Sequence, residues 1–306
     1  MLTTLTPIVT AFFATRVADA RRVLHGRGQL YPGLETLTID WLPPVVLISA
    51  YAPFTDSDAL VALLRASDVH GQIRSIVLQH RDEQQSPADL LWGEHLEEVV
   101  VSEGALRFLV RPGRRQNAGL FLDTRLLRDW LLGNCHQRKV VNLFAYTCSL
   151  SVAALAGGAH SVCNVDMSRP SIQWGEANHV LNNQALTQVK SIPHNLFTSW
   201  GRIQQFGRYD LVLVDPPTRQ RGSFNVERDY AAVLKKLPKL CAPGADIIAT
   251  LNSPFLPVSF LHETFARILP HSEFVGRLPT PPEFADRDPE QALKICHYRL
   301  PLKATA

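Results

Sequence analysis

Short apolar runs alternate with segments of helical periodicity from about residue 120 to the C-terminal end of the chain. Runs rich in Val, Ile and Leu, each followed by a turn, predict strands. The predicted strands are 140–144, 161–165, 189–192, 211–214, 246–251, 273–278 and 294–300. The predicted helices between them are 149–155, 168–182, one from about 196, 226–237 and 257–269. This alternation predicts an α/β fold, a parallel sheet with helices on both faces.

The first part of the chain has a mixed pattern. The helices predicted there are 11–23 and 57–64, and the predicted strands are 45–51, 76–79, 98–101 and 106–111. A chain of 306 residues is long enough for two domains. We therefore predict a small α+β domain over residues 1–115, followed by the α/β domain over residues 116–306.

The composition is that of an ordinary globular protein, with 46% hydrophobic and 19% charged residues. A net charge of +3 permits a nucleic-acid partner but does not require one. No apolar run approaches the length of a membrane span, and no basic flank precedes the apolar start, so neither a membrane helix nor a signal peptide is expected. Five cysteines without a Cys-x-x-Cys pair predict reduced thiols in a cytoplasmic protein and indicate no metal site.

One strand-like run, Tyr209-Asp-Leu-Val-Leu-Val214, ends on Asp215, and two prolines follow. Proline has no N–H to donate and a fixed φ, so Pro216 and Pro217 stop the strand and leave a carboxylate at its carboxyl end. In open α/β sheets that edge is where ligands bind. Taken alone, Asp-Pro-Pro is also typical of a simple turn that ends a strand.

Asn142, Asp166 and Asn195 stand near the ends of the other predicted strands. The turn 142–149 lacks the Gly-x-Gly-x-x-Gly fingerprint that a pyrophosphate needs. A nucleoside cofactor without phosphates fits better, and S-adenosylmethionine is the candidate. Asp166 could accept hydrogen bonds from ribose hydroxyls, and Asn195 could meet an adenine edge. Each residue alone could be a cap or turn residue, but their placement at successive strand ends favours a nucleoside site.

Five motifs follow one another along residues 105–300. They are Gly119-Leu-Phe-Leu-Asp-Thr-Arg125, Asn142-Leu-Phe-Ala-Tyr-Thr147, Ala156-Gly-Gly-Ala159, Val165-Asp-Met-Ser168 and Asp215-Pro-Pro-Thr218. Together they resemble class I S-adenosylmethionine-dependent methyltransferases of the large-subunit ribosomal RNA type, which act on bases of 23S RNA. The segment 24–33 also resembles the start of the small α+β domain that precedes the catalytic domain in that family. The resemblance implies a Rossmann-like methyltransferase sheet, S-adenosylmethionine as cofactor and ribosomal RNA as partner.

The resemblance also implies the residues of the site. The implied cofactor-binding residues are Phe121, Asp123, Arg125, Asn142, Phe144, Ala145, Tyr146, Thr147, Cys148, Asp166, Met167, Asn195, Leu196 and Asp215. Asp123 and Arg125 are expected near the methionine end of the cofactor, with a structural ion pair as the alternative. The implied catalytic residues are Asp215, Pro216, Pro217 and Asn252. Asp215 could orient the base or offset its positive charge, the Pro216 carbonyl could accept a base amino hydrogen, and Asn252 could support that edge.

Two positions depart from the family pattern. Cys148 replaces the usual glycine of the cofactor loop, and a Cβ there is expected to narrow the backbone approach to the cofactor. Arg219 replaces a phenylalanine that often follows Asp-Pro-Pro-Thr and could stack on a base. We therefore expect stacking to use Phe224, Tyr230 or the Arg219 guanidinium.

The acceptor atom is predicted from the residues after the fifth strand of the sheet. Methylation of pyrimidine carbon 5 needs a thiolate nucleophile, and family members with that activity place a cysteine there. Here the segment reads Thr250-Leu-Asn-Ser253, which more closely resembles the branch that methylates guanine N7. We predict guanine N7 rather than cytosine C5, with Cys148 and Cys241 as packing thiols.

Basic clusters are the candidates for phosphate contacts, although each could be an ordinary solvated face. They consist of Arg111, Arg114 and Arg115, of Arg219 and Arg221, and of Lys235, Lys236 and Lys239. Two other functions stay open: a methyltransferase for a small molecule or protein, and a weakened cofactor-binding module. The sequence does not determine the target nucleotide, the form of the RNA substrate or the oligomeric state, for which a homodimer is one option.

Overall fold

The computed structural model of the protein describes residues 1–220 and 223–302. Its contacts divide the chain into two compact units, residues 1–122 with 281–289, and residues 123–280 with the stretch from Glu290 onward. The boundary predicted at residue 115 lies shortly before this division, and the sequence pattern does not reveal that 281–289 belongs with the first unit. Among the described residues, no helix combines the length and apolar character needed to span a membrane.

The first unit is built on a five-stranded sheet with the order β1-β2-β3-β4-β5. Its strands are β1 (Arg21–His25), β2 (Leu37–Leu42), β3 (Val45–Ala50), β4 (Ser75–His80) and β5 (Ala88–Gly93). β3 and β4 are parallel and joined through α2 (Ser57–Ser67), whereas the other pairs are antiparallel. The unit also contains α1 (Leu2–Phe13), the hairpin β6 (Val99–Glu103) and β7 (Leu106–Val110), and the short 3-10 helices η1 (Gly26–Gly28) and η5 (Pro282–Phe284).

The helix predicted at 11–23 is wrong, because α1 ends at Phe13 and β1 follows it. Apolar residues four positions apart form the buried side of α1 and fix it earlier in the chain. They are Leu5, Val9 and Phe13, all fully buried. The pattern also misses β1, β2 and β5. Charged residues interrupt the apolar alternation there, and an ion pair of 2.5 Å between Arg22 and Asp40 joins β1 to β2.

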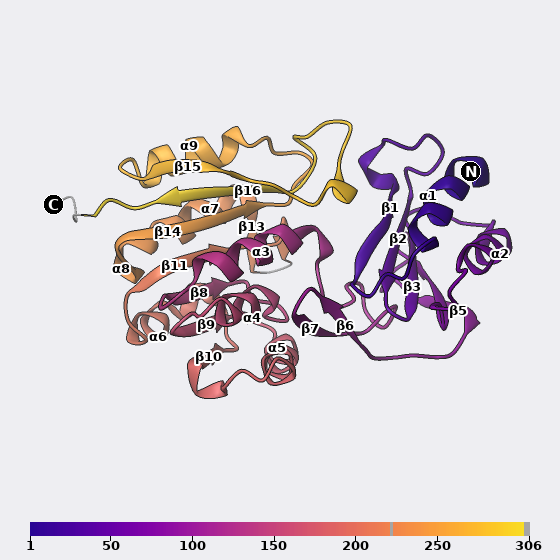
Figure 1. Ribbon diagram of the computed structural model, residues 1–306. Helices are drawn as coiled ribbons and strands as arrows, with labels where there is room; N and C mark the ends of the chain where they lie inside the picture. The colour runs from indigo at the N-terminus through magenta and orange to yellow at the C-terminus, as the bar shows by residue number, and fades with distance from the viewer. Residues whose placement is uncertain (221–222, 303–306) are drawn as a thin grey trace. The chain divides into compact units, whose positions relative to one another are not determined.

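The second unit is built on a seven-stranded sheet with the order β10-β9-β8-β11-β14-β16-β15 (Figure 1). Its strands are β8 (Lys139–Leu143), β9 (Ser161–Val165), β10 (Val189–Ile192), β11 (Tyr209–Val214), β14 (Cys241–Leu251), β15 (Glu273–Leu278) and β16 (Lys294–Arg299). The first five pair in parallel, and β16 is antiparallel to β14 and β15. The predicted α/β fold is confirmed. The strand order reverses at β8, which is where ligands bind in such sheets.

Helices cover both faces of this sheet (Figure 1). On one face are α3 (Arg125–Asn134), α4 (Ser149–Ala156) and α5 (Arg169–Leu181), of which α4 packs against both other helices and against β8 and β9. The helices of the other face are α6 (Trp200–Gln205), α7 (Val226–Leu234), α8 (Leu237–Leu240) and α9 (Ser259–Ile268). They bury a large apolar core against the sheet, with Val141, Val212 and Ile247 on the strands and Val233 and Phe265 on the helices.

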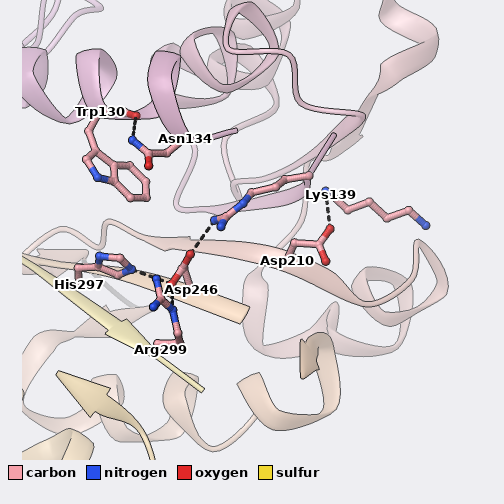
Figure 2. Close-up of polar contacts among 8 residues, drawn as sticks. Trp130, Asn134, Lys139, Asp210, Asp246, His297 and Arg299 are labelled. Carbon is pink, nitrogen blue, oxygen red and sulfur yellow. Dashed lines mark hydrogen bonds and ion pairs between the residues drawn. The ribbon is translucent and has the colours of Figure 1, made fainter. Parts of the chain in front are cut away.

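An ionic cluster lies near the amino-terminal ends of the parallel strands (Figure 2). Asp246 of β14 is 2% exposed, and its Oδ2 accepts a hydrogen bond from Arg138 Nη1 at 2.7 Å. Its Oδ1 accepts from His297 Nε2 and from Arg299 Nε, both at 2.8 Å. Burial raises the pKa of Asp246, but the hydrogen bonds from His297, Arg138 and Arg299 outweigh it and lower the pKa below its ordinary value.

Candidate active site

The carboxyl ends of the parallel strands bring together most of the polar side chains predicted from the sequence. Asp166 directly follows β9, Asp215 follows β11, and Asn252 follows β14, while Asn195 lies shortly after β10. Because these strands are parallel, their carboxyl ends share one edge of the sheet. The loop after β8 reaches the same edge, at the point where the strand order reverses.

Asp166 is fixed by the backbone of two loops. Its Oδ2 accepts a hydrogen bond from Tyr146 N at 2.9 Å, and its Oδ1 accepts from Ser168 N at 2.8 Å. Burial raises the pKa of Asp166, although the two backbone hydrogen bonds act in the opposite direction. Each oxygen has a further lone pair that can accept a hydrogen bond from a hydroxyl group. The carboxylate is therefore suited to bind a vicinal diol such as that of a ribose.

The loop after β8 has an unusual backbone. Phe144, Tyr146 and Cys148 have φ angles of 62°, 46° and 63°, in the left-handed region. Such conformations cost about 1–3 kcal/mol each in non-glycine residues, and a cluster of them within one loop is typical of functional sites. The loop is tied to the end of β9 by a hydrogen bond of 3.0 Å that Ala145 N donates to Val165 O. These backbone angles indicate a loop shaped for a ligand.

Cys148 does not narrow this site, contrary to the expectation from the sequence. Its side chain is 1% exposed and packs against Ala145 and Ile172. Burial raises the pKa of its thiol. The thiol occupies the space beside Gly175 of α5, where an added Cβ would lie 2.2 Å from the Cys148 Sγ. The missing side chain at position 175 therefore makes room for the cysteine.

A narrow cleft lies between the loops that follow β8, β9 and β10. Its walls include Phe144, Asp166, Asn195, Phe197 and Phe224. The Phe224 ring packs edge-on against Phe144, with centroids 4.9 Å apart, and is stacked with Phe197 at 6.4 Å. Asn195 Oδ1 accepts from Phe197 N at 2.9 Å, so its Nδ2 is the group that it can offer to a ligand. No Lys or Arg belongs to the part of the lining that the structure describes.

Several predicted cofactor-binding residues have other surroundings. Asn142 is 1% exposed and donates to Asn164 Oδ1 at 3.2 Å, and Thr147 is equally buried behind the loop. Their side chains support the loop and do not line the cleft. Met167 and Leu196 do line it. Phe121 belongs to the first unit, where its side chain is 37% exposed.

Asp215 is partly buried, and its Oδ1 accepts a short hydrogen bond from the Thr250 hydroxyl of β14. Burial raises the pKa of Asp215 to about 6, the charge of Asp123 acts in the same direction, and Thr250 and Arg128 oppose it. A carboxyl group with a raised pKa at the ligand-binding edge of a sheet is a candidate catalytic group.

Arg128 of α3 is a candidate that the sequence analysis misses. It is fully buried, and its Nη1 donates to Thr124 Oγ1 at 2.7 Å. A buried guanidinium needs compensating polar groups, and the charge of Arg128 lowers the pKa of Asp215. Arg125, predicted to lie at the cofactor, forms an ion pair of 3.8 Å with Asp129 on its own helix. The available signal for Arg128 was a second arginine one helical turn after Arg125.

The Asp-Pro-Pro-Thr segment is tied to the loop after β14. Pro216 is buried, and Pro217 is exposed. The Thr218 hydroxyl donates a short hydrogen bond to the Asn252 carbonyl, while the Asn252 side chain is exposed. The four predicted catalytic residues therefore belong to two loops that are hydrogen-bonded to each other.

The side chains expected to stack on a base are mostly buried. Phe224 is 2% exposed and Tyr230 is fully buried, so neither can stack on an incoming base as predicted. The Tyr230 hydroxyl instead donates to Thr250 O at 3.1 Å. Arg219 is exposed on β12 (Arg219–Gln220), which pairs with β13 (Phe224–Asn225). Arg221 lies outside the described residues.

The basic clusters differ in their availability for phosphates. In the first unit Arg111 Nε lies 2.6 Å from Glu98 Oε1, and Arg114 Nη1 lies 3.3 Å from Glu97 Oε2. These ion pairs reduce the charge that the two arginines can offer to RNA. The lysines at and after the end of α7 are exposed. They are Lys235, Lys236 and Lys239.

All five cysteines are buried. Burial raises the pKa of Cys135 and Cys241 to about 12, and that of Cys163 and Cys296 to about 11. A thiol becomes a nucleophile only as the thiolate, so these groups are inert at neutral pH. Within the part of the chain that the structure describes, no group of three His, Cys, Asp or Glu side chains could hold a metal ion.

The fold and the cleft define a Rossmann-like enzyme that binds a nucleoside cofactor at the carboxyl edge of its sheet. The family of S-adenosylmethionine-dependent methyltransferases matches residues 21–299, and the chain belongs to this family. Its cofactor is therefore S-adenosylmethionine. The described residues fit that molecule, because Asp166 can accept hydrogen bonds from ribose hydroxyls and the aromatic side chains Phe144 and Phe197 line the cleft beside it.

Two curated relatives bear the name of a large-subunit ribosomal RNA methyltransferase. The ribosomal RNA large subunit methyltransferase K/L of Shewanella frigidimarina is 32% identical over 219 residues, which are 70% of this chain and 30% of that protein. The protein of the same name from Shewanella pealeana is 38% identical over 160 residues, 51% of this chain and 22% of the relative. The chain thus spans less than a third of the length of these relatives.

Solved structures share the fold. A methyltransferase structure complexed with SAH superimposes with a TM-score of 0.84 at 21% identity, covering 98% of this chain and 82% of the other. The S-adenosylmethionine-dependent methyltransferase from Agrobacterium tumefaciens gives a TM-score of 0.67 at 20% identity, with 88% of both chains covered.

Proposed function

We propose that the protein transfers a methyl group from S-adenosylmethionine to a base of large-subunit ribosomal RNA. The observation that carries this proposal is the Asp215–Thr250 pair at the carboxyl edge of the sheet, in a chain 32% identical over 219 residues to a large-subunit ribosomal RNA methyltransferase. The cofactor supplies a methyl group on a positively charged sulfur, which an electron pair of the acceptor attacks. The protein must hold that electron pair in line with the methyl group. The cytoplasm, where ribosomal RNA is found, is the expected location.

We favour guanine N7 over cytosine C5 as the acceptor atom. Cytosine C5 needs a thiolate, and the segment 250–253 after β14 contains no cysteine. Guanine N7 already has a lone pair, so it needs no covalent intermediate. The ring gains positive charge as the methyl group arrives, and the Asp215 carboxylate can offset that charge. This electrostatic role suits a carboxyl that is partly buried and held by Thr250.

The remaining edge residues would position the base. A base inside RNA structure must be flipped out before it can reach the cofactor. The carbonyl of Pro216, a residue fixed between Asp215 and Pro217, could accept a hydrogen bond from the base amino group. The exposed Asn252 side chain could support the same edge. The lysines after α7 could contact phosphates, which would orient the RNA without reading its sequence.

Unmodified large-subunit ribosomal RNA, transcribed in vitro, tests this proposal. With methyl-labelled cofactor, followed by digestion and nucleoside chromatography, we expect labelled 7-methylguanosine. Labelled 5-methylcytidine, or a covalent adduct with RNA that contains 5-fluorocytidine, would contradict the N7 assignment and keep the RNA substrate. Label that enters only a small molecule or a protein of a cell extract would contradict the RNA substrate itself. The Asp215→Asn variant is the matched control and should transfer little label.

A further inference from the structure

We propose that Phe255 is the side chain that stacks on the RNA at the mouth of the active site, next to or on the target base. The inference rests on the proposed function, because it assigns to that site a recognition element for a flat aromatic partner. Neither the sequence motifs nor the catalytic residues include this position.

Phe255 presents its ring to solvent. Its side chain is 86% exposed, more than any other large apolar side chain among the residues that the structure describes. The next most exposed phenylalanine there is Phe274, at 46%. Single exposed apolar residues are common on protein surfaces, so exposure alone would not assign a role. The position and the rigidity of the loop supply the remaining arguments.

The loop that carries Phe255 is fixed at several points. The Asn252 carbonyl accepts a short hydrogen bond from the Thr218 hydroxyl, and the Ser253 carbonyl accepts from Lys294 Nζ at 2.8 Å. Lys294 is fully buried. Phe255 N donates to Ser253 Oγ at 3.3 Å, and prolines precede and follow the segment at positions 254 and 257. A ring on a pre-organised loop loses little conformational entropy when it binds a partner.

Phe255 lies close to the catalytic motif. It is three residues beyond Asn252, so its Cα is within about 11 Å of the Asn252 Cα, the greatest reach of three extended residues. The Asn252 carbonyl is hydrogen-bonded to Thr218, which is three residues beyond Asp215. Thr250, two residues before Asn252, is bonded to Asp215 itself. Phe255 therefore belongs to a loop that is hydrogen-bonded to the catalytic motif, within reach of a base held at that edge.

The two aromatic side chains that the sequence pattern offers for stacking present no face to solvent. Phe224 and Tyr230 are buried, and the phenylalanine that the family often places after Asp-Pro-Pro-Thr is Arg219 here. The exposed ring on the neighbouring loop supplies the missing aromatic surface. Base–aromatic stacking contributes about 1–3 kcal/mol per base, which is about 5-fold to 150-fold in affinity. An unstacked RNA base is the partner whose shape and chemistry match one exposed ring at a methyl-transfer site.

Three substitutions at this position separate stacking from simple apolar contact. Phe255→Ala removes the ring, Phe255→Leu keeps apolar volume without a π face, and Phe255→Tyr keeps the π face. Phe206→Ala is the matched control, because Phe206 is 38% exposed and precedes β11 at the opposite edge of the sheet. Unmodified large-subunit ribosomal RNA is the probe, in filter binding without cofactor and in methyl transfer. Calorimetry with S-adenosylmethionine and thermal melting check the cofactor site and the fold.

We expect Phe255→Ala and Phe255→Leu to weaken RNA binding and to raise the KM for RNA by about 10-fold or more, the scale of one lost stack. Phe255→Tyr and Phe206→Ala should stay within about 3-fold of the unchanged protein, and cofactor affinity should not change in any variant. Wild-type RNA affinity in Phe255→Ala would overturn the inference while leaving the proposed function intact. A change of oligomeric state with unchanged RNA affinity would also overturn it, in favour of a protein contact. If the unchanged protein neither binds nor methylates RNA, the proposed function fails and Phe255 loses its assigned role with it.

Discussion

Asp215 is the single residue whose charge state should limit catalysis. Its pKa of about 6 leaves the carboxylate as the main form at neutral pH and the neutral acid as the main form below that value. If the carboxylate offsets charge on the base, the methyl-transfer rate should fall as the pH drops through about 6. Asp215→Asn should lower the single-turnover rate about 100-fold or more and abolish this acid limb. Cofactor affinity should change much less.

Thr250 gives an internal control for this assignment. Its hydrogen bond lowers the pKa of Asp215, so Thr250→Val should move the acid limb to higher pH without removing it. Single-turnover rates across the pH range measure both effects. An acid limb that persists unchanged in Asp215→Asn would show that another group titrates. A lower melting temperature with a normal rate per folded molecule would assign Asp215 to the turn alone.

Asp166 should carry the main polar contact to the cofactor. Asp166→Ala removes the acceptor for two ribose hydroxyls, and it should weaken S-adenosylmethionine binding by about 1.5–3 kcal/mol, the scale of a hydrogen bond to a charged group. Calorimetry measures the affinity. Because the carboxylate also accepts from Tyr146 N and Ser168 N, a melting curve must accompany the measurement. Unchanged affinity in a folded variant would remove Asp166 from the cofactor site.

At the scale of elements, the sequence predicts most of the second unit because local chemistry determines it. Ser168 is an example, since it was expected to cap the helix that follows β9 and its Oγ accepts from Ser171 N at 3.2 Å. The left-handed angles of Phe144 and Tyr146 could not be predicted, because these residue types are not turn signals. The Asp215–Thr250 hydrogen bond could not be predicted either, because the pairing of β11 with β14 brings together residues that are far apart in the chain.

The contact between the loop after β8 and α5 predicts that a Gly→Ala substitution within a helix will destabilise the protein. Gly→Ala inside a helix normally stabilises it by about 1 kcal/mol. Gly175→Ala should instead destabilise the protein by about 1–3 kcal/mol, the cost of overpacking, because the new Cβ would lie 2.2 Å from the Cys148 Sγ. Denaturant unfolding measures the change.

The double variant Cys148→Gly with Gly175→Ala should recover most of this loss. It removes the clashing thiol, and glycine also tolerates the left-handed angle at position 148. Cofactor affinity should remain close to normal in the double variant, because the Cys148 side chain does not line the cleft. Additive effects of the two substitutions would show that the side chains do not compete for one space.

At the scale of the whole chain, the excursion of residues 281–289 between β15 and β16 completes the first unit. Arg287 N donates to Gly28 O at 2.8 Å, and the Arg22 guanidinium lies 4.5 Å from the centre of the Phe284 ring. A Cβ on Gly28 would lie 2.2 Å from Ala285 O, which explains why a glycine is needed in the segment 24–33. Such a long-range return leaves no periodic signal, so the sequence analysis could not assign it.

The Asp246 cluster should determine how the second unit responds to acid (Figure 2). Asp246→Asn removes the charge that compensates Arg138 and Arg299 and weakens the acceptor for His297, and it should lower the free energy of unfolding by about 2–3 kcal/mol. The expected loss is smaller than for a fully buried ion pair, because the Arg299 side chain is 44% exposed and therefore partly solvated. The active-site edge lies at the other end of the strands, so methyl transfer per folded molecule should persist.

The pH dependence of stability provides the sharper test of this cluster. The pKa of Asp246 is lowered by folding, so its contribution is complete above the ordinary aspartate pKa of about 3.9 and is lost as the pH falls below it. The difference in unfolding free energy between the unchanged protein and Asp246→Asn should therefore shrink as the pH falls from about 5 toward 3. Urea unfolding at these pH values measures it. A difference that stays constant down to pH 3 would mean that the substitution acts through packing, because only a loss of charge interaction depends on protonation of this carboxylate.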